Sequence, residues 1–208
     1  LMIGVSVDVK VNAESLDSNT LEKEILEKAK LGLELGISDS NKDKVVLVEN
    51  ADKTEKLQNA LNLGSGKIVV LPYGSSYEVS GLKVPENTTI IGYGSKIYND
   101  KQHTTLLTIG SGVKIYGLEI QGAGNKDANV KGIGINIAGA DSANYIKNIV
   151  IQDSFIHDIG FFGIKADFAD NVTVINTKVE NIGYAGIGAM SVSKFHVDKR
   201  KKKNIYFT

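Results

Sequence analysis

Two segments of this chain repeat one pattern at a fixed distance. Residues 148–164 begin with an asparagine, continue with β-branched residues and end in a Gly-Ile pair, and residues 171–187 do the same 23 residues later. A fixed period of this size without helical spacing is typical of a short β unit stacked on its own copy. The sequence therefore predicts a β-solenoid, and we expect its function on the outer surface of the coils.

Composition narrows the functional classes. The 208 residues carry 24 basic and 24 acidic side chains, so no global field attracts nucleic acid or an anionic membrane. Cysteine is absent, which excludes a disulfide scaffold, a thiolate metal site and a cysteine nucleophile. Apolar runs fall short of the roughly 18 residues that span a bilayer. We expect no nucleic-acid partner and no membrane insertion. Because the chain begins with Leu1 and ends inside a strand pattern, we interpret it as a fragment of a longer protein.

Residues 1–50 lack the repeat and are predicted to form a separate extension. Thr20 can cap a helix that Gly36 would end. Its apolar positions recur every four residues, at Leu21, Ile25, Ala29 and Leu33. The helix is either a small packing element or an attachment or oligomerisation segment. The polar stretch 38–44 indicates a linker.

Residues 51–208 are predicted to form the solenoid. They open with a short helix over residues 54–63, marked by a capping acceptor at Asp52 three residues before Glu55. Strand patterns follow from residue 67. The first coil of a solenoid would otherwise expose apolar core and unpaired backbone. We therefore expect this helix to cover the amino-terminal end of the core.

The opening of this region resembles a known superfamily. Residues 51–61, 66–74 and 82–94 resemble the start of the pectate-lyase-like right-handed parallel β-helix superfamily, and most of all the β-helix of bacteriophage tailspike and appendage proteins. The resemblance implies an all-β, right-handed parallel β-helix in a homotrimeric virion protein. It also implies contacts with other virion proteins through the amino-terminal segment, and a host surface polysaccharide or cell-wall glycopolymer as the ligand.

The same superfamily leaves alternatives open. It includes secreted polysaccharide lyases, hydrolases and epimerases as well as non-catalytic structural or adhesive solenoids. Whether this chain cleaves a glycan is therefore left open by its sequence. No cofactor is predicted, although lyases that resemble this fold use calcium beside aspartates, so Ca²⁺ stays an open alternative. The extracellular space is the alternative location to a virion.

The repeat predicts which side chains face the core. We align the strand beginning at Gly163 with those beginning at Gly186 and Gly132. The predicted inward positions are Ile133, Ile135, Ile164, Ala166, Ile187 and Ala189. The predicted outward row is Gly134, Asn136, Lys165, Asp167, Gly188 and Met190. A second set of matched positions, Asp153 and Asn176, is predicted to form a stacked turn ladder and not a metal site.

Three turns are longer than the repeat requires. Residues 122–131 precede the strand at Gly132, and residues 138–145 follow it. A third insertion is predicted over residues 194–203, because Asn204 is taken to begin the strand that matches Asn171. Together these turns would wall one outward strand face and make it a groove.

Polar residues in and beside this groove are the catalytic candidates. Lys165 and Asp167 are two apart on one strand and share its outer face. A lysine there could abstract a proton next to a uronate, and an aspartate could protonate a glycosidic oxygen. The alternative is a surface ion pair. His157 and Glu180 occupy equivalent positions one coil apart, as either a catalytic or a cross-strand pair.

The predicted glycan contacts are turn residues and the basic run. Asp158, which is also a catalytic candidate, and Asn181 are equivalent residues at the turn that enters the groove strand. The complete set of predicted substrate-binding residues is Asn136, Asp127, Asp141, Tyr145, Asn181, Tyr184, Lys199, Arg200 and Lys201. Six basic residues within residues 194–203 predict attraction for an anionic polymer, unless the run is a solvated loop. The three histidines are scattered and predict no metal site.

Overall fold

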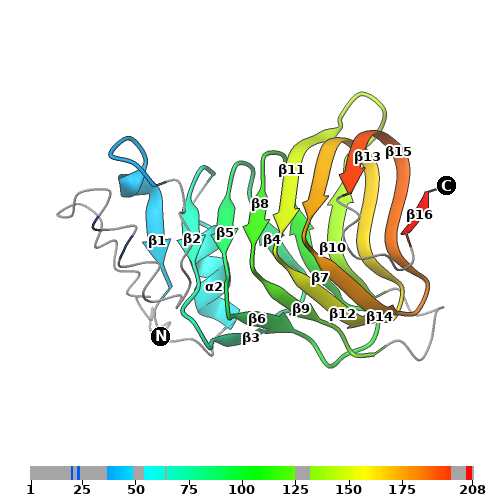
Figure 1. Ribbon diagram of the computed structural model, residues 1–208, viewed down its shortest axis with the longest axis horizontal. Helices are drawn as coiled ribbons and strands as arrows, with labels where there is room; N and C mark the ends of the chain where they lie inside the picture. The colour runs from blue at the N-terminus through cyan, green and yellow to red at the C-terminus, as the bar shows by residue number, and fades with distance from the viewer. Residues whose placement is uncertain are drawn as a thin grey trace, which may run out of the picture.

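Parallel strands stacked coil upon coil make up the computed structural model of this chain. The structure describes Thr20, Lys23 and residues 37–48, 54–63, 65–124, 132–197 and 205–207. About 53% of the described residues are strand, and the strands form a β-solenoid of about six turns, whose coils run from β1 on the left to β15 on the right in Figure 1. The all-β solenoid predicted from the repeat is confirmed.

Each coil contributes strands to three rows. The first row holds β1 (Val45–Leu47), β2 (Ile68–Val70), β5 (Thr89–Ile91), β8 (Lys114–Tyr116) and β11 (Ile146–Gln152). The second row holds β3 (Ser76–Glu78), β6 (Lys96–Tyr98), β9 (Glu119–Gln121), β12 (Phe155–Ile159) and β14 (Lys178–Ile182). The third row holds β4 (Leu82–Val84), β7 (Thr105–Ile109), β10 (Ile133–Ala138) and β16 (Ile205–Phe207). Two long strands, β13 (Phe162–Ile175) and β15 (Ala185–Val197), run from the third row around a corner into the first.

The core is a set of aliphatic stacks inside the three rows. The predicted core residues Ile149, Ile151, Ile164, Val172, Val174 and Ile187 are all at most 3% exposed. They belong to one hydrophobic cluster that runs through the coils. Burying each such side chain stabilises the fold by about 1.5–3 kcal/mol relative to leaving it exposed. The cluster therefore joins successive coils into one folding unit.

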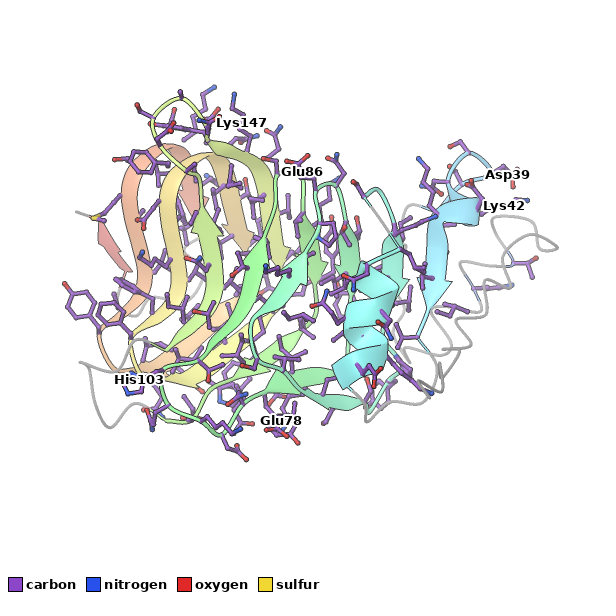
Figure 2. All side chains as sticks on the ribbon, turned by 180° about the vertical axis from the view of Figure 1, so that it is seen from behind. Asp39, Lys42, Glu78, Glu86, His103 and Lys147 are labelled. Atoms are coloured by element: carbon purple, nitrogen blue, oxygen red, sulfur yellow. The ribbon has the colours of Figure 1, made fainter. Side chains whose placement is uncertain are left out.

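One corner of the coil repeats a left-handed backbone residue. Its members, all with φ between 54° and 78°, are Gly66, Asn87, Gly112, Asn148, Asn171 and Lys194. Backbone hydrogen bonds join neighbouring corners, since Gly66 N–H donates to Glu86 O, just before Asn87, and Gly112 N–H donates to Lys147 O, just before Asn148. Figure 2 shows Glu86 and Lys147 along one edge of the solenoid, with Glu78 and His103 along the opposite edge. Glycine and asparagine tolerate this φ best, which explains their recurrence.

A second corner carries the ladder predicted at Asp153 and Asn176. The Asn176 Nδ2 group donates to Asp153 Oδ1 at 2.7 Å, and the Tyr93 hydroxyl donates to Asp153 Oδ2 at 2.8 Å. Burial raises the pKa of Tyr93, and the bonded Asp153 carboxylate raises it further. The phenol therefore stays protonated as a donor, and the stacked turn ladder is confirmed.

The first helix of the solenoid covers the edge of the third row. Helix α2 (Thr54–Leu61) matches the predicted helix except that residues 62 and 63 form a turn. It buries Leu57 and Leu61 in the main core cluster. The Gln58 amide oxygen accepts from Lys83 N–H at 3.1 Å, and its Nε2 donates to Lys83 O at 3.2 Å. The side-chain amide thus bonds the free edge of β4 as a neighbouring strand would.

The predicted register of β10 is wrong by two residues. Ile135, and not Ile133, pairs with Ile164. Gly134 is not outward, because a Cβ atom on it would lie 2.7 Å from the buried Ile159 Cδ1. Ile133 is only partly buried and pairs with Phe162. A two-residue shift keeps the alternation of faces, so Asn136 and Lys165 still share the outward side.

The third predicted insertion is also wrong. Lys194 takes the left-handed corner conformation of Asn171, and β15 then continues to Val197 in register with Val172–Val174. The 23-residue period therefore holds for this coil, and residues 195–197 are strand. Ile205 in β16 pairs with Ile187 in the third row, not with the strand after Asn171. Of the other two predicted insertions, residues 138–145 are described and follow β10, whereas residues 125–131 lie outside the described residues.

The amino-terminal extension is described in part. Thr20 and Lys23 are helical, while the other residues of the predicted helix lie outside the described residues. Residues 42–44 form a 3₁₀ turn, and β1 then pairs with β2, with Val45 and Val46 buried. Among the helices that the structure describes, none is long and apolar enough to cross a membrane.

The core assignment predicts a severe effect for Ile164→Asp. An unpaired carboxylate at this fully buried position should cost several kcal/mol of unfolding free energy. Ile164→Val, the matched control, should cost only about 1 kcal/mol. Thermal unfolding followed by circular dichroism measures both. An Ile164→Asp protein that melts like the parent would contradict the coil assignment.

The corner ladder predicts that Asn171 tolerates glycine better than alanine. Both substitutions remove the bond from Asn171 Nδ2 to Asn148 Oδ1, which is 2.8 Å long. Only alanine adds left-handed strain, about 1–2 kcal/mol. Urea unfolding should therefore show Asn171→Ala less stable than Asn171→Gly by about 1 kcal/mol. The reverse order would show that the left-handed corner is not what constrains this position.

Candidate functional site

A hollow of about 380 Å³ lies on the outward face of β13 and β15. Its lining residues are Phe162, Lys165, Asp167, Tyr184, Ala185, Gly188, Ala189 and Met190. Strand alternation explains part of the set, since Lys165 and Asp167 alternate with the buried Ile164 and Ala166. Phe162 lies on the same outer side because Gly163 faces inward, where its Cβ atom would lie 2.6 Å from Val179 Cγ1. The volume is within the range of about 300–1,000 Å³ typical of small-ligand sites.

Two charged side chains of the hollow bind each other. Lys165 Nζ lies 2.5 Å from Asp167 Oδ2, and both side chains are mostly shielded from solvent. This juxtaposition was predicted from their spacing of two residues. The Lys165 amine and the Asp167 carboxylate can each form further hydrogen bonds to a ligand, while their opposite charges cancel.

An aromatic cluster borders the hollow at the corner between the second and third rows. The ring centroids of Phe161 and Phe162 are 4.3 Å apart, and Tyr184 lies 5.0 Å and 5.3 Å from them. Backbone bonds fix the corner, because Tyr184 N–H and Ala185 N–H both donate to Phe161 O. Tyr184 nevertheless remains 60% exposed, so one of its faces is open to a ligand.

A separate polar group lies on the second row, around His157. His157 Nδ1 is 2.7 Å from Asp158 Oδ2, and His157 Nε2 is 3.1 Å from Glu119 Oε1. The imidazole also stacks on Phe155, with ring centroids 4.1 Å apart. Since both ring nitrogens face carboxylate oxygens, neither is free to act as a base towards a ligand. The arrangement holds β9 and β12 together.

The predicted pair of His157 and Glu180 is in register but makes other contacts. The two residues are Cα partners in β12 and β14. Glu180 instead lies 2.7 Å from Lys178 Nζ, and Lys178 Nζ lies 5.0 Å from the centre of the Phe155 ring. The charges that face outward here are therefore largely satisfied by one another.

Asp158 and Asn181 form the equivalent pair that the repeat predicts. Both have left-handed backbones, and the Asn181 amide donates to Asp158 Oδ1. Burial raises the pKa of Asp158, but hydrogen bonds from His157 and Asn181 outweigh it and hold the pKa below its usual value. Asp158 O also accepts from Gly124 N–H at 2.7 Å, at the base of the extended turn 122–131.

The remaining predicted residues are divided among several places. Asn136 pairs with Lys165 in the outward row next to the hollow. Asp141 accepts from Ala143 N–H and from the Asn144 side chain within the extended turn 138–145, and the Ala143 bond is the main cause of its lowered pKa. Tyr145 packs on Phe168 at 6.0 Å. Four more lie outside the described residues: Asp127, Lys199, Arg200 and Lys201.

The structure thus brings three predicted site residues together, namely Lys165, Asp167 and Tyr184, and places the His157 group elsewhere. Sequence reasoning missed Phe162 and Glu119. Phe162 faces outward because Gly163 and Ile164 both face the core, which breaks the alternation that the prediction assumed. Glu119 meets His157 diagonally across adjacent coils, since its Cα partner is Phe155.

No metal centre emerges from the part of the chain that the structure describes. Groups of three or more His, Asp or Glu side chains that could hold an ion are absent from it. The geometry instead provides an apolar, aromatic hollow with one ion pair, which suits an organic ligand.

Fold and hollow together define a β-solenoid protein with a hollow on its lateral face whose volume falls in the range of small-ligand sites. No family model and no curated protein matches the chain. Among solved structures, the crystal structure of the Dettilon tailspike protein (gp208) is similar at 12% sequence identity and a TM-score of 0.22, over 88% of this chain and 53% of that one. The chain thus spans about half the length of that protein. A similarity at this level carries no conclusion about function, which has to be inferred from the site itself.

The Asp158 contacts predict a pH-dependent stability. Because the pKa of Asp158 is lowered on folding, its ionised form stabilises the native state above the unfolded pKa of about 3.9. This contribution is lost as the pH falls through the lower, native pKa. Asp158→Asn should therefore be less stable than the parent at pH 7, and the two should converge below about pH 4. Guanidinium unfolding at pH 7 and pH 3 checks this, and an unchanged difference would contradict it.

Proposed function

We propose that this chain binds a cell-surface glycan through the hollow on β13 and β15, as the solenoid of a phage tailspike or appendage-type protein. The observation that carries the proposal is the half-open hollow in which the exposed Tyr184 ring and Phe162 stand beside the Lys165–Asp167 pair. It lies on the lateral surface of a rod, where a long polymer can lie against it without entering a closed cavity.

The chemistry of a sugar matches this lining. One face of a pyranose ring is covered by C–H groups, which pack on the negative face of an aromatic ring, while its hydroxyl groups lie around the edge. Tyr184 offers such a ring face. Lys165 donates hydrogen bonds and Asp167 accepts them, so the pair can bind hydroxyl groups at the edge of a sugar that rests on the ring.

The geometry supports binding and not cleavage. Glycoside hydrolysis usually needs two carboxyl groups about 5–9.5 Å apart across the scissile bond. Among the residues that line the hollow, Asp167 alone carries a carboxylate, and Lys165 occupies one of its oxygens. Asp158 and Glu180, the other carboxylates predicted for catalysis, lie in the second-row groups described above. The hollow can therefore bind a glycan without cleaving it.

The finer assignment is supported by the sequence. The segments between residues 51 and 94 resemble the start of the pectate-lyase-like β-helix of phage tailspikes, and the solenoid architecture agrees with such a protein. On this proposal the protein is part of a virion, assembles as a homotrimer and contacts other virion proteins through its amino-terminal segment. Its partner is a host surface polysaccharide or cell-wall glycopolymer.

Binding should depend on Tyr184. Tyr184→Ala removes the exposed ring of the hollow and should weaken glycan binding about two- to tenfold, as expected from the 0.5–1.5 kcal/mol that an aromatic contact contributes. Tyr73→Ala is the matched control, since Tyr73 is also about half exposed but does not line the hollow. Titration calorimetry with a panel of purified capsular and cell-wall polysaccharides measures both. Equal losses in the two variants, or none in either, would contradict the site.

Product analysis tests the absence of cleavage. The parent chain incubated with the polysaccharide that it binds should release no oligosaccharides, as judged by chromatography and by the appearance of new reducing ends. Release of products that stops in Asp167→Asn would show instead that the hollow is catalytic.

A further inference from the structure

The hollow is unusually apolar for an exposed surface. Four large hydrophobic side chains are exposed among the residues that the structure describes, and two of them, Tyr184 and Met190, line this one hollow. Phe162 and Ala185 extend the same apolar surface. Clustered exposed apolar groups mark binding sites, because single exposed ones need no explanation. The occupant therefore has an apolar part of its own.

The charges of the hollow argue against a charged occupant. Its two ionised side chains, Lys165 and Asp167, have opposite signs and lie 2.5 Å apart. An anionic group that approached Lys165 would also meet Asp167, and a cationic group that approached Asp167 would meet Lys165. A neutral hydroxyl group, which both donates and accepts, can bond to either member without separating them.

The lack of a side chain at Gly188 makes room for the Phe162 ring. A Cβ atom on Gly188 would lie 2.3 Å from that ring. Gly188 is the Cα partner of Lys165 on the neighbouring coil, so it lies in the outward row beside the polar pair. The Phe162 ring therefore packs over Gly188 and forms an aromatic wall of the hollow.

The two described basic residues of the run 194–203 do not alter this balance. Lys194 is exposed but lies at the corner that leads into the first row, as its register after Ser193 shows. His196 pairs with Thr173 in that row. Neither residue lines the hollow.

From these observations we infer that the hollow selects an uncharged sugar unit that carries a methyl-bearing substituent, such as a 6-deoxy sugar or an O-acetylated or N-acetylated one. The methyl group packs between Phe162, Tyr184 and Met190, and hydroxyl groups bond to Lys165 and Asp167. The inference rests on the proposed glycan binding and specifies its ligand class.

A matched set of polymers tests the ligand class. The probes are an O-acetylated neutral polysaccharide, the same polymer after alkaline de-O-acetylation, a rhamnan, a dextran, a polygalacturonate and a glycerol teichoic acid. The parent chain should bind the acetylated polymer or the rhamnan at least tenfold more tightly than the de-O-acetylated polymer, the dextran or either polyanion. This binding should change less than twofold between 50 and 500 mM salt, since screening acts on charged contacts.

Two variants locate the effect. Gly188→Val should displace the Phe162 ring, since its Cβ atom would lie 2.3 Å from that ring, and should thereby deform the hollow and lower binding of the preferred neutral polymer at least tenfold. Gly132→Val, at a glycine outside the hollow whose added Cβ atom would make no contact shorter than 3.5 Å, controls for general effects of the substitution. Unfolding curves verify that both variants are folded. Should Gly188→Val fail to fold, Met190→Lys, an exposed substitution that adds a charge to the hollow, takes its place with the same expected loss.

The outcomes separate the two claims. Tightest binding of a polyanion, with an affinity that falls as salt rises and is lost in Gly188→Val, would overturn the neutral ligand class while glycan binding by the hollow stands. Binding of a polymer that Gly188→Val leaves unchanged would overturn the hollow as the site and the inference with it. A parent chain that binds none of these polymers, nor any of the capsular and cell-wall polysaccharides, would overturn the proposed function as well.

Discussion

The left-handed corner residue is the constraint on which the rest of the structure depends. A coil of fixed length closes only if the chain turns sharply at the same place each time, and six residues from Gly66 to Lys194 do so with positive φ. Because the corners stack, their backbone N–H groups bond the coil that follows, and the strands between them are forced into parallel register. The aliphatic core stacks and the outward rows are consequences of this register.

The hollow shows how a regular scaffold acquires a specific surface. Repetition brings equivalent positions side by side, so an outward row would ordinarily be a uniform ladder of side chains. In this row Lys165 follows Asn136, and then Gly188 carries no side chain. The Phe162 ring of the preceding coil packs over this position instead and becomes a wall of the hollow. A hollow of this kind requires no irregular loop, only a break in the ladder at a single step.

The architecture could be predicted because stacked coils need matching residues at a fixed period, and Asn148 and Asn171 make that period visible in the sequence. The prediction failed where two neighbouring residues fit the repeat equally well. Gly132 and Gly134 both precede isoleucine, and only the folded turn shows that Gly134 matches Gly163. The next coil was not predicted, because Lys194 takes the left-handed corner conformation that Asn148 and Asn171 have in the two preceding coils. The Lys165–Asp167 contact was predictable from spacing alone, whereas Phe162 and Glu119 depend on diagonal or shifted contacts that no local pattern contains.

The Gln58 side-chain amide makes one edge of the third row different from the other. By bonding both the N–H and the C=O of Lys83, it satisfies the edge of β4 and leaves that side of the row no free backbone group at this position to recruit another strand. From this capped edge the row proceeds in chain order, from β4 to β7, β10, β13 and β15. The amide of one side chain therefore fixes the starting point from which the register of every later coil in the row is set.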